Sequence, residues 1–485
     1  MFACKRAQIA AAHAVSVAIR LGIVAIVANG GAVLGAAPDY YHRGMNDLDA
    51  GALDRAMAEF DDAIKLDPRF ARAYCGRALV WDRKGDYDKA ILAYRDAARR
   101  FPRDPMVHAG LGLELCQKGE YDRSIAAFDI AVALEPNSPK IYRGRGAARF
   151  ALGTSYANRG RVELAETEYA HAVSDYDKAI RWNPLDEYAF CDRGCAHALI
   201  GESMRDRGMI GPAKAEYLAA IADLDEAIRL DPKDALAFNN RGIAFDAIGD
   251  WARARSDYDA AIRLRPNSAT TYTNRGITFV DMRLFQSAIA DFGRAIRLDP
   301  KCAEAFRRRA DFFDDMGRYD DALKDYDTAI ALAPDRYTYW NNRGMVQYHR
   351  GAYRRAIADF DKAITICPNQ GGAHSNRGLA WDEIGESNKA LEDYNDAVRL
   401  NPNDADSNYN RARHEFTIGK VDQALADLSR AINARPTFGK AFYLRGCVFQ
   451  AIGDCAKASA DFQRAEKLGF ASGAKTAGGT GKTGP

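Results

Sequence analysis

The sequence has few of the residues that build active sites and almost no excess of charge of one sign. It contains 8 histidines in 485 residues, with no His-Glu-x-x-His and no Ser/His/Asp set at a known catalytic spacing. The 9 cysteines show no repeated spacing, so no disulfide and no metal site is predicted. A net charge of +2 argues against a general nucleic-acid binder. We therefore expect a protein that is not an enzyme, needs no cofactor and binds no nucleic acid.

Long apolar runs are also scarce, and the one candidate lies near the N-terminus. Lys5, Arg6 and Arg20 precede an apolar run at 21–27, and small residues follow as far as Ala37. The pattern predicts a signal peptide over residues 1–36 and hence a periplasmic or exported protein. An uncleaved inner-membrane anchor is the alternative, and it would be the only membrane attachment. At the other end, residues 471–485 are rich in Gly, Thr and Lys and are expected to be disordered.

Proline, in contrast, is placed with great regularity. Eight of the ten gaps between eleven successive prolines are 34 residues long, and the other two are 48. The prolines are Pro68, Pro102, Pro136, Pro184, Pro232, Pro266, Pro300, Pro334, Pro368, Pro402 and Pro436. A fixed period of this length predicts an array of one small unit, which offers a long surface instead of a single pocket.

Residues other than proline repeat at the same period. With proline as position 32, position 27 is Ala in all twelve units, position 20 is Ala in eleven, and position 24 is aromatic in ten. Small residues at positions 8, 20 and 27 let two helices approach closely around the aromatic side chain. Gly at position 15 suits a left-handed turn, and proline at position 32 ends the second helix. Each unit is therefore expected to be a helical hairpin.

These features resemble the tetratricopeptide repeat (TPR) family, over residues 37–470. The resemblance implies an all-α fold: a right-handed α-α superhelical solenoid of about twelve TPR hairpins. It also implies that the first helix of each hairpin lines a concave groove for a protein or peptide partner.

The chain departs from the family at position 7, where an arginine replaces the usual large apolar residue in eleven units. A partly buried arginine needs a partner. Position 23 offers one, because it is Asp in nine units. We expect a ladder of Arg–Asp pairs joining the first helix to the second; the alternative is a solvated arginine without a fixed partner.

The fourth and fifth units have 14 extra residues each, at 154–167 and 202–215. Gly160 and Gly208 stand seven residues beyond the expected turns. Seven residues are close to two helical turns, so we expect both helices of each hairpin to lengthen in phase, by about 10 Å. The two extensions are predicted to pack on one another. They would form either a ridge that contacts a partner or a tolerated duplication.

By the resemblance, the groove is lined by positions 2, 5, 9, 12 and 13 of each first helix. In units 6 to 10 these positions are mainly acidic, with apolar residues between them, which favours a basic, partly hydrophobic segment. The predicted partner-binding residues are Asp246, Asp281, Glu304, Arg307, Asp311, Asp314, Asp315, Met345, Tyr348, Asp382 and Glu383. Asn at position 6 recurs too regularly to be specific for a ligand, and we assign it to the framework.

The predicted function is a scaffold without enzymatic activity that binds a protein or peptide partner, including basic segments, in its groove. The alternative is a structural or assembly component of the cell envelope that handles a polymer or a multiprotein complex.

Overall fold

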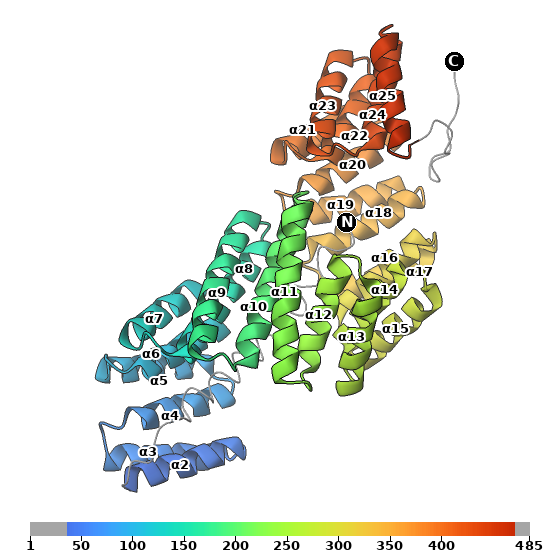
Figure 1. Cartoon of the computed structure of the whole chain (residues 1–485). Coiled ribbons are helices and arrows are strands. Elements are labelled where there is room, and N and C mark those ends of the chain that lie inside the picture. The colour runs from blue at the N-terminus through green and yellow to red at the C-terminus, as the bar shows by residue number, and fades with distance from the viewer. Residues whose placement is uncertain (1–35, 471–485) are drawn as a thin grey trace. The chain divides into compact units, whose positions relative to one another are not determined.

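The computed structural model describes residues 36–470, and the described part of the chain is all-helical. Twenty-four helices lie in it, and within each of two compact units successive helices pack as antiparallel hairpins (Figure 1). The predicted signal or anchor segment and the predicted disordered tail lie outside the described residues, except for the first residue of the opening helix.

The chain divides into two compact units at Arg283 and Leu284, within the seventh repeat. The N-terminal unit contains α2 (Ala36–Asp49), α3 (Leu53–Leu66), α4 (Ala71–Arg83), α5 (Tyr87–Arg100), α6 (Pro105–Gln117), α7 (Tyr121–Leu134), α8 (Pro139–Asn158), α9 (Val162–Trp182), α10 (Glu187–Asp206), α11 (Ile210–Leu230), α12 (Ala235–Ala247), α13 (Trp251–Leu264) and α14 (Ala269–Asp281). The C-terminal unit contains α15 (Phe285–Leu298), α16 (Ala303–Asp315), α17 (Tyr319–Leu332), α18 (Tyr337–His349), α19 (Tyr353–Ile366), α20 (Gly371–Glu383), α21 (Ser387–Leu400), α22 (Ala405–Thr417), α23 (Val421–Ala434), α24 (Gly439–Ala451) and α25 (Cys455–Lys467).

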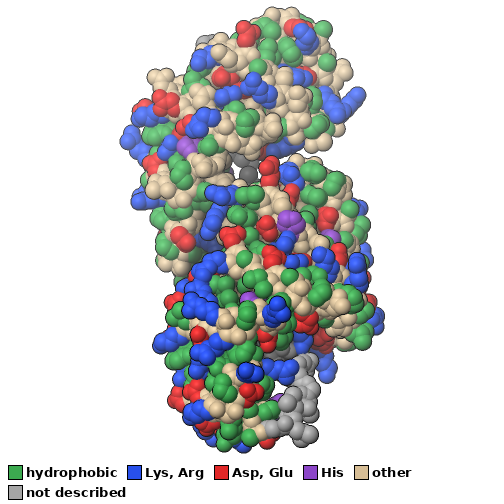
Figure 2. Space-filling view, turned by 90° about the vertical axis from the view of Figure 1, so that its left-hand side faces the viewer, with side chains coloured by type: hydrophobic (Ala, Val, Ile, Leu, Met, Phe, Trp, Pro, Cys, Tyr) green, Lys and Arg blue, Asp and Glu red, His purple; other side chains and the backbone are tan. Residues whose placement is uncertain are grey.

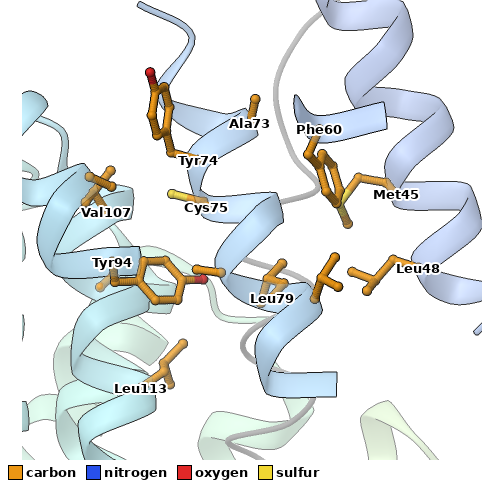
Figure 3. Packing of buried hydrophobic residues seen from close by; sticks show 14 of the residues in the cluster. Met45, Leu48, Phe60, Ala73, Tyr74, Cys75, Leu79, Tyr94, Val107 and Leu113 are labelled. Carbon is orange, nitrogen blue, oxygen red and sulfur yellow. The ribbon is translucent and has the colours of Figure 1, made fainter. Parts of the chain in front are cut away.

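The core of each hairpin has the composition that the repeat predicts. Phe60, the position-24 aromatic of the first repeat, is fully buried, and a Cβ atom on Gly44 or Gly76 would come within 3.0 Å of its ring. Close contact of the helices therefore depends on small residues at these points. Figure 3 shows Phe60 facing Met45 near Leu48 and Leu79, while Tyr94 fills the equivalent place in the next repeat.

The turns within the hairpins are left-handed, as expected at position 15. Gly85, Gly249 and Gly385, for example, have φ values between 77° and 81°. The turn of the seventh repeat is also left-handed, but Arg283 replaces glycine there and adopts a φ of 59°. A side chain with a Cβ is strained in this region, so this turn forms at some cost in stability.

The lengthened hairpins have the predicted geometry. Helices α8 and α10 have 20 residues and α9 and α11 have 21, against 13 or 14 in ordinary repeats (Figure 1). Their turns lie at Gly160 and Gly208, with φ values of 73° and 78°. The extensions contact one another, since Arg207 Nη2 donates to Glu166 Oε2 at 2.6 Å. Tyr156 and Met204 pack against the same apolar cluster.

The Arg–Asp ladder is confirmed in eight repeats. In each one the arginine Nε and Nη2 donate to the two carboxylate oxygens of the position-23 aspartate, at 2.5–2.9 Å. The pairs are Arg145–Asp175, Arg193–Asp223, Arg241–Asp257, Arg309–Asp325, Arg343–Asp359, Arg377–Asp393, Arg411–Asp427 and Arg445–Asp461. The aspartate side chains are only 3–9% exposed, so these are bidentate pairs shielded from water.

The same arginines make a second set of contacts that the sequence analysis missed, and we call this set the second rail of the ladder. The remaining arginine nitrogen, Nη1, reaches position 25 of the preceding repeat, for example from Arg343 to Asp327 at 2.6 Å. The same contact joins Arg145 to Asp129 and Arg377 to Asp361. Each such arginine therefore holds three helices together: its own, its hairpin partner and the second helix of the repeat before.

Candidate functional site

The predicted groove residues divide into buried side chains that join repeats and exposed side chains that a partner could reach. In the N-terminal unit Asp246 belongs to the first group, with an exposed fraction of 6%. Its Oδ2 atom accepts hydrogen bonds from the Tyr258 hydroxyl at 3.0 Å and the Thr278 hydroxyl at 2.6 Å. Asp281, at the end of α14, is exposed.

Three of the predicted residues in the C-terminal unit, all on α16, form a buried ionic network. Arg307, 5% exposed, donates from Nε to Glu304 at 2.9 Å and from Nη1 to Asp311 at 2.6 Å. Arg308 also donates to Glu304, at 2.8 Å, while the Tyr326 hydroxyl donates to Asp311. In this structure these charges satisfy one another and join α16 to its neighbours.

The other two acidic residues of α16 lie nearer to solvent. Asp314 accepts a hydrogen bond from His349 Nδ1 of the next repeat at 3.0 Å, and Asp315 is exposed. Partial burial, with the charges of Asp314 and Asp311 nearby, raises the pKa of Asp315 to about 6. A hydrogen bond to Asp314 raises the pKa of His349 as well. A pKa of about 6 still leaves Asp315 mainly ionised at neutral pH, beside the carboxylate of Asp314.

Apolar and aromatic side chains follow in the ninth and tenth repeats. Met345 and Tyr348 are partly buried against the cluster around Ile357. The Tyr348 hydroxyl donates to Glu383 Oε1 at 3.1 Å, and Glu383 is exposed. Three predicted residues on the first helices α18 and α20, together with Asp314 and Asp315 on α16, thus lie where a partner could contact them. We call the set Asp314, Asp315, Met345, Tyr348 and Glu383 the acidic–aromatic face.

Asp382 is the centre of a cluster that the sequence analysis did not find. Its Oδ1 accepts from His414 Nδ1 at 2.6 Å and its Oδ2 from the Tyr394 hydroxyl at 2.8 Å. The opposite ring nitrogen, Nε2 of His414, lies 3.2 Å from Ser387 Oγ. Arg413 Nη2 is 3.8 Å from Asp382 Oδ2. The structure therefore brings a serine, a histidine and an aspartate into one hydrogen-bonded chain.

This cluster is a variant of an arrangement that recurs along the array. Asp at position 12, Tyr at position 24 and a polar residue at position 10 of the next repeat occur together at three places, and at two of them they are hydrogen-bonded. Asp246, Tyr258 and Thr278 form one, and Asp382, Tyr394 and His414 another. Asp82, Tyr94 and Glu114 occupy the same positions in the second and third repeats. A polar residue at position 10, which is apolar or small in most repeats, is the sequence signal that could have revealed the clusters.

The position-6 asparagines have the framework role that we assigned to them. Asn274 Nδ2 donates to Asn239 Oδ1 of the preceding repeat at 3.1 Å, and Asn376 donates to Asn341 at 3.0 Å. Asn240 Nδ2 lies 3.0 Å from Cys195 Sγ and 3.8 Å from Cys191 Sγ, both buried thiols. These hydrogen bonds fix the stacking of successive first helices.

Residues 36–470 contain no group of three or more His, Cys, Asp or Glu side chains arranged to hold a metal ion. None of the helices in this range is both long and apolar enough to span a bilayer.

Comparison with known proteins identifies the class. The tetratricopeptide repeat profile matches residues 41–105, 213–269, 273–315, 313–371 and 377–437, and a second TPR repeat profile matches 112–153. These ranges cover more than half of the chain, so the protein belongs to the tetratricopeptide repeat family. Proteins of this family typically mediate protein–protein interactions.

A solved structure shares the fold at low sequence identity, and a second aligns less well. The crystal structure of yeast Tom70 aligns with a TM-score of 0.50 and 15% identity, covering 88% of this chain and 96% of that one. The Cut9 and Hcn1 hetero-tetramer of the APC/C aligns with a TM-score of 0.43 and 12% identity, covering 88% and 92%. No curated protein sequence matches significantly. The described chain is thus an all-α TPR superhelical fold.

Proposed function

We propose that the chain is a binding scaffold that recognises a basic, partly apolar protein segment on the acidic–aromatic face. The observation that carries the proposal is the residual exposure of this face. Asp315 in the eighth repeat and Glu383 in the tenth remain exposed on either side of Met345 and Tyr348, whereas Glu304, Arg307 and Asp311 are hydrogen-bonded to one another within the packed array. Stacking of the repeats needs Glu304, Arg307 and Asp311. It does not need exposed carboxylates beside Met345 and Tyr348.

The chemistry of the face suits a cationic segment. Lysine or arginine side chains would pair with Asp315 and Glu383, while apolar side chains would contact Met345 and Tyr348. Tyrosine provides a large, rigid contact surface with a polar hydroxyl group, as at many protein interfaces. The opposite charge of such a segment would also increase its association rate at low ionic strength.

A pair of charge reversals tests this proposal. The double variant Asp315→Lys with Glu383→Lys should lose partners that wild-type protein retains in crosslinking and mass spectrometry from native cells. Both side chains are exposed, so the fold should persist. The matched control is Glu392→Lys with Asp422→Lys, which makes the same charge change at exposed positions of the second helices α21 and α23. Equal recovery of partners by both variants would contradict the proposal.

The pH dependence supplies an independent check. The pKa of Asp315 is raised to about 6, so this carboxylate gains a proton as the pH falls through about 6. The pKa of His349 is also raised, so its imidazole adds positive charge to the face as the pH falls. Affinity for a captured cationic partner should therefore weaken between pH 8 and pH 5. Binding that strengthens on acidification would point to a different surface.

A further inference from the structure

The most distinctive unassigned chemistry in the described chain is the linear arrangement of Ser387, His414 and Asp382. Ser387 Oγ and His414 Nε2 are 3.2 Å apart, and His414 Nδ1 and Asp382 Oδ1 are 2.6 Å apart. A serine activated by an imidazole whose second nitrogen is held by a carboxylate is the arrangement that serine hydrolases use, and it is recognised by geometry, not by sequence position. The three residues come from α21, α22 and α20.

The order of these residues explains why no motif revealed them. Asp382 and Ser387 lie on either side of the turn in the tenth repeat, whereas His414 comes from the eleventh. Stacking of the two repeats is what completes the chain of hydrogen bonds. The prediction that the protein is not an enzyme relied on known spacings in the sequence, and those spacings do not describe an arrangement built across two repeats.

The surroundings fix the imidazole in one orientation. The His414 side chain is 3% exposed, and its ring lies 5.6 Å from the ring of Tyr394. The Tyr394 hydroxyl holds the second oxygen of Asp382 at 2.8 Å, so that the first oxygen faces the imidazole. A carboxylate so placed, here with a side chain 20% exposed, selects the tautomer that carries hydrogen on Nδ1 and leaves Nε2 free to accept the serine proton.

The nucleophile lies at the start of a helix, where backbone amides are available. Ser387 is the first residue of α21 and is half-buried. The first backbone hydrogen bond of this helix runs from the Ala390 amide to the Glu386 carbonyl, at 3.0 Å, so the amides of residues 387–389 precede it. The Glu386 side chain makes no capping hydrogen bond, unlike Asp86 of α5 and Asp250 of α13, which accept from Lys89 and Arg253. Such amides stabilise a developing oxyanion.

We propose that Ser387, His414 and Asp382 form a hydrolytic site for short-chain carboxylic esters. Ser387 Oγ bonds to the ester carbonyl carbon, its proton passes to His414 Nε2, and the amides at the start of α21 face the oxyanion. The bond from carbon to the alkoxy oxygen then breaks, and the alcohol leaves with the proton from Nε2. Water attacks the acyl-serine in the same way, releasing the carboxylic acid and returning a proton to Oγ. Asp382 stays ionised throughout as the positioning residue for the imidazole.

The first experiment is covalent labelling of the full-length chain. A fluorophosphonate probe reacts with serines that a neighbouring base activates. We expect one phosphonyl group per chain, mapped to Ser387 by peptide mass spectrometry. Labelling should vanish in Ser387→Ala and persist in Ser459→Ala, which changes an exposed serine of α25. Absence of labelling at Ser387 in the folded wild-type protein would overturn the proposal.

The second experiment measures turnover of p-nitrophenyl acetate. Hydrolysis by the wild type should exceed that by Ser387→Ala by about 10²-fold or more, and Asp382→Asn should cause a loss of similar or larger size through the wrong imidazole tautomer. Tyr394→Phe keeps the ring but removes the hydroxyl that holds Asp382, so it should reduce the rate by a smaller factor. Circular dichroism confirms that each variant is folded. Equal rates for the wild type and Ser387→Ala would refute the site.

Discussion

Glu114 on α6 is the residue whose ionisation should weigh most on the stability of the described chain. Its side chain is fully buried, and neither carboxyl oxygen has a hydrogen-bond partner among the described residues. Burial, with a smaller contribution from the charge of Asp82, raises the pKa of Glu114 to about 9. At neutral pH the carboxyl group is therefore protonated in the folded state. The folded chain thus avoids the cost of burying an unpaired charge.

The first prediction concerns this residue. In the unfolded chain Glu114 loses its proton near pH 4.5, its ordinary pKa, whereas the folded chain keeps the proton up to about pH 9. The folded state binds more protons between these values, so stability should fall as the pH rises from 4.5 to 9. Glu114→Gln should remove this loss and raise the melting temperature most at pH 8–9, with little effect at pH 4. Melting curves against pH test it, with exposed Glu392→Gln as the control.

Arg343 and Asp359 offer the clearest test of a single rung of the ladder. The aspartate side chain is 8% exposed and the arginine 19%. Removal of either partner leaves the other charge poorly hydrated, at a cost of about 3–5 kcal/mol if the pair behaves as buried. A double-mutant cycle with Arg343→Ala and Asp359→Ala should give a coupling energy above about 1 kcal/mol in urea unfolding. A coupling energy near zero would show that the Arg343–Asp359 pair does not stabilise the fold.

The pKa of the aspartate is shifted in different directions in different Arg–Asp pairs. Burial raises the pKa of Asp359, and the hydrogen bonds from Arg343 only partly offset this effect. In the next repeat burial acts in the same sense on Asp393, but hydrogen bonds from Arg377 and His374 outweigh it and lower the pKa. One histidine near a rung is enough to reverse the direction of the shift, because it adds a second hydrogen-bond donor to the same carboxylate.

At the scale of helices, the second rail of the ladder is interrupted at one place in the C-terminal unit. Arg309 makes the bidentate pair with Asp325, but position 25 of the preceding second helix is Gly293. A Cβ atom at Gly293 would meet only Arg297 Nη1, at 3.4 Å. Helix α15 therefore has room for an acidic side chain at the point where the eighth and ninth repeats have Asp327 and Asp361.

The open space beside Gly293 leads to a prediction of increased stability. Gly293→Asp should stabilise the chain, because it improves helix propensity and supplies Arg309 with its second carboxylate. Gly293→Asn is the matched control, since it has nearly the same shape without the charge. The Asp variant should exceed the Asn variant by about 0.5–1 kcal/mol in urea unfolding at low salt, the range of a partly exposed ion pair. Equal stabilities would show that the second rail contributes nothing here.

The two long hairpins give a prediction that depends on their mutual packing. Tyr156 and Met204 contribute to one cluster, and Arg207 pairs with Glu166 across the extensions. Deletion of 154–167 alone should expose the apolar side of the other extension and lower the melting temperature. Deletion of 154–167 and 202–215 together should leave an array of 34-residue repeats that melts higher than either single deletion. A double deletion that fails to fold would make the extensions essential to the array.

At the scale of the whole molecule, the framework was predictable from the sequence, whereas which of the groove positions stay exposed and which are buried between repeats was not. The hairpins, the displaced turns at Gly160 and Gly208 and the bidentate ladder follow from positions that repeat, because every repeat has the same packing problem. Asp246 and Arg307 have the position of groove residues, yet their side chains are buried by Tyr258 and by Glu304. Such outcomes depend on which residues a neighbouring repeat supplies, and these residues do not follow the period.

The arrangement of the arginine ladder has a consequence for how such an array can change in length. Arg377 takes one partner from its own repeat and one from the preceding repeat, at positions that most repeats occupy alike. Junctions of this kind therefore present equivalent donors and acceptors on their two sides. A gene that gains or loses one 34-residue segment at any of these junctions would still encode a matched joint there. In-register recombination can accordingly lengthen or shorten the binding surface without a new interface having to evolve.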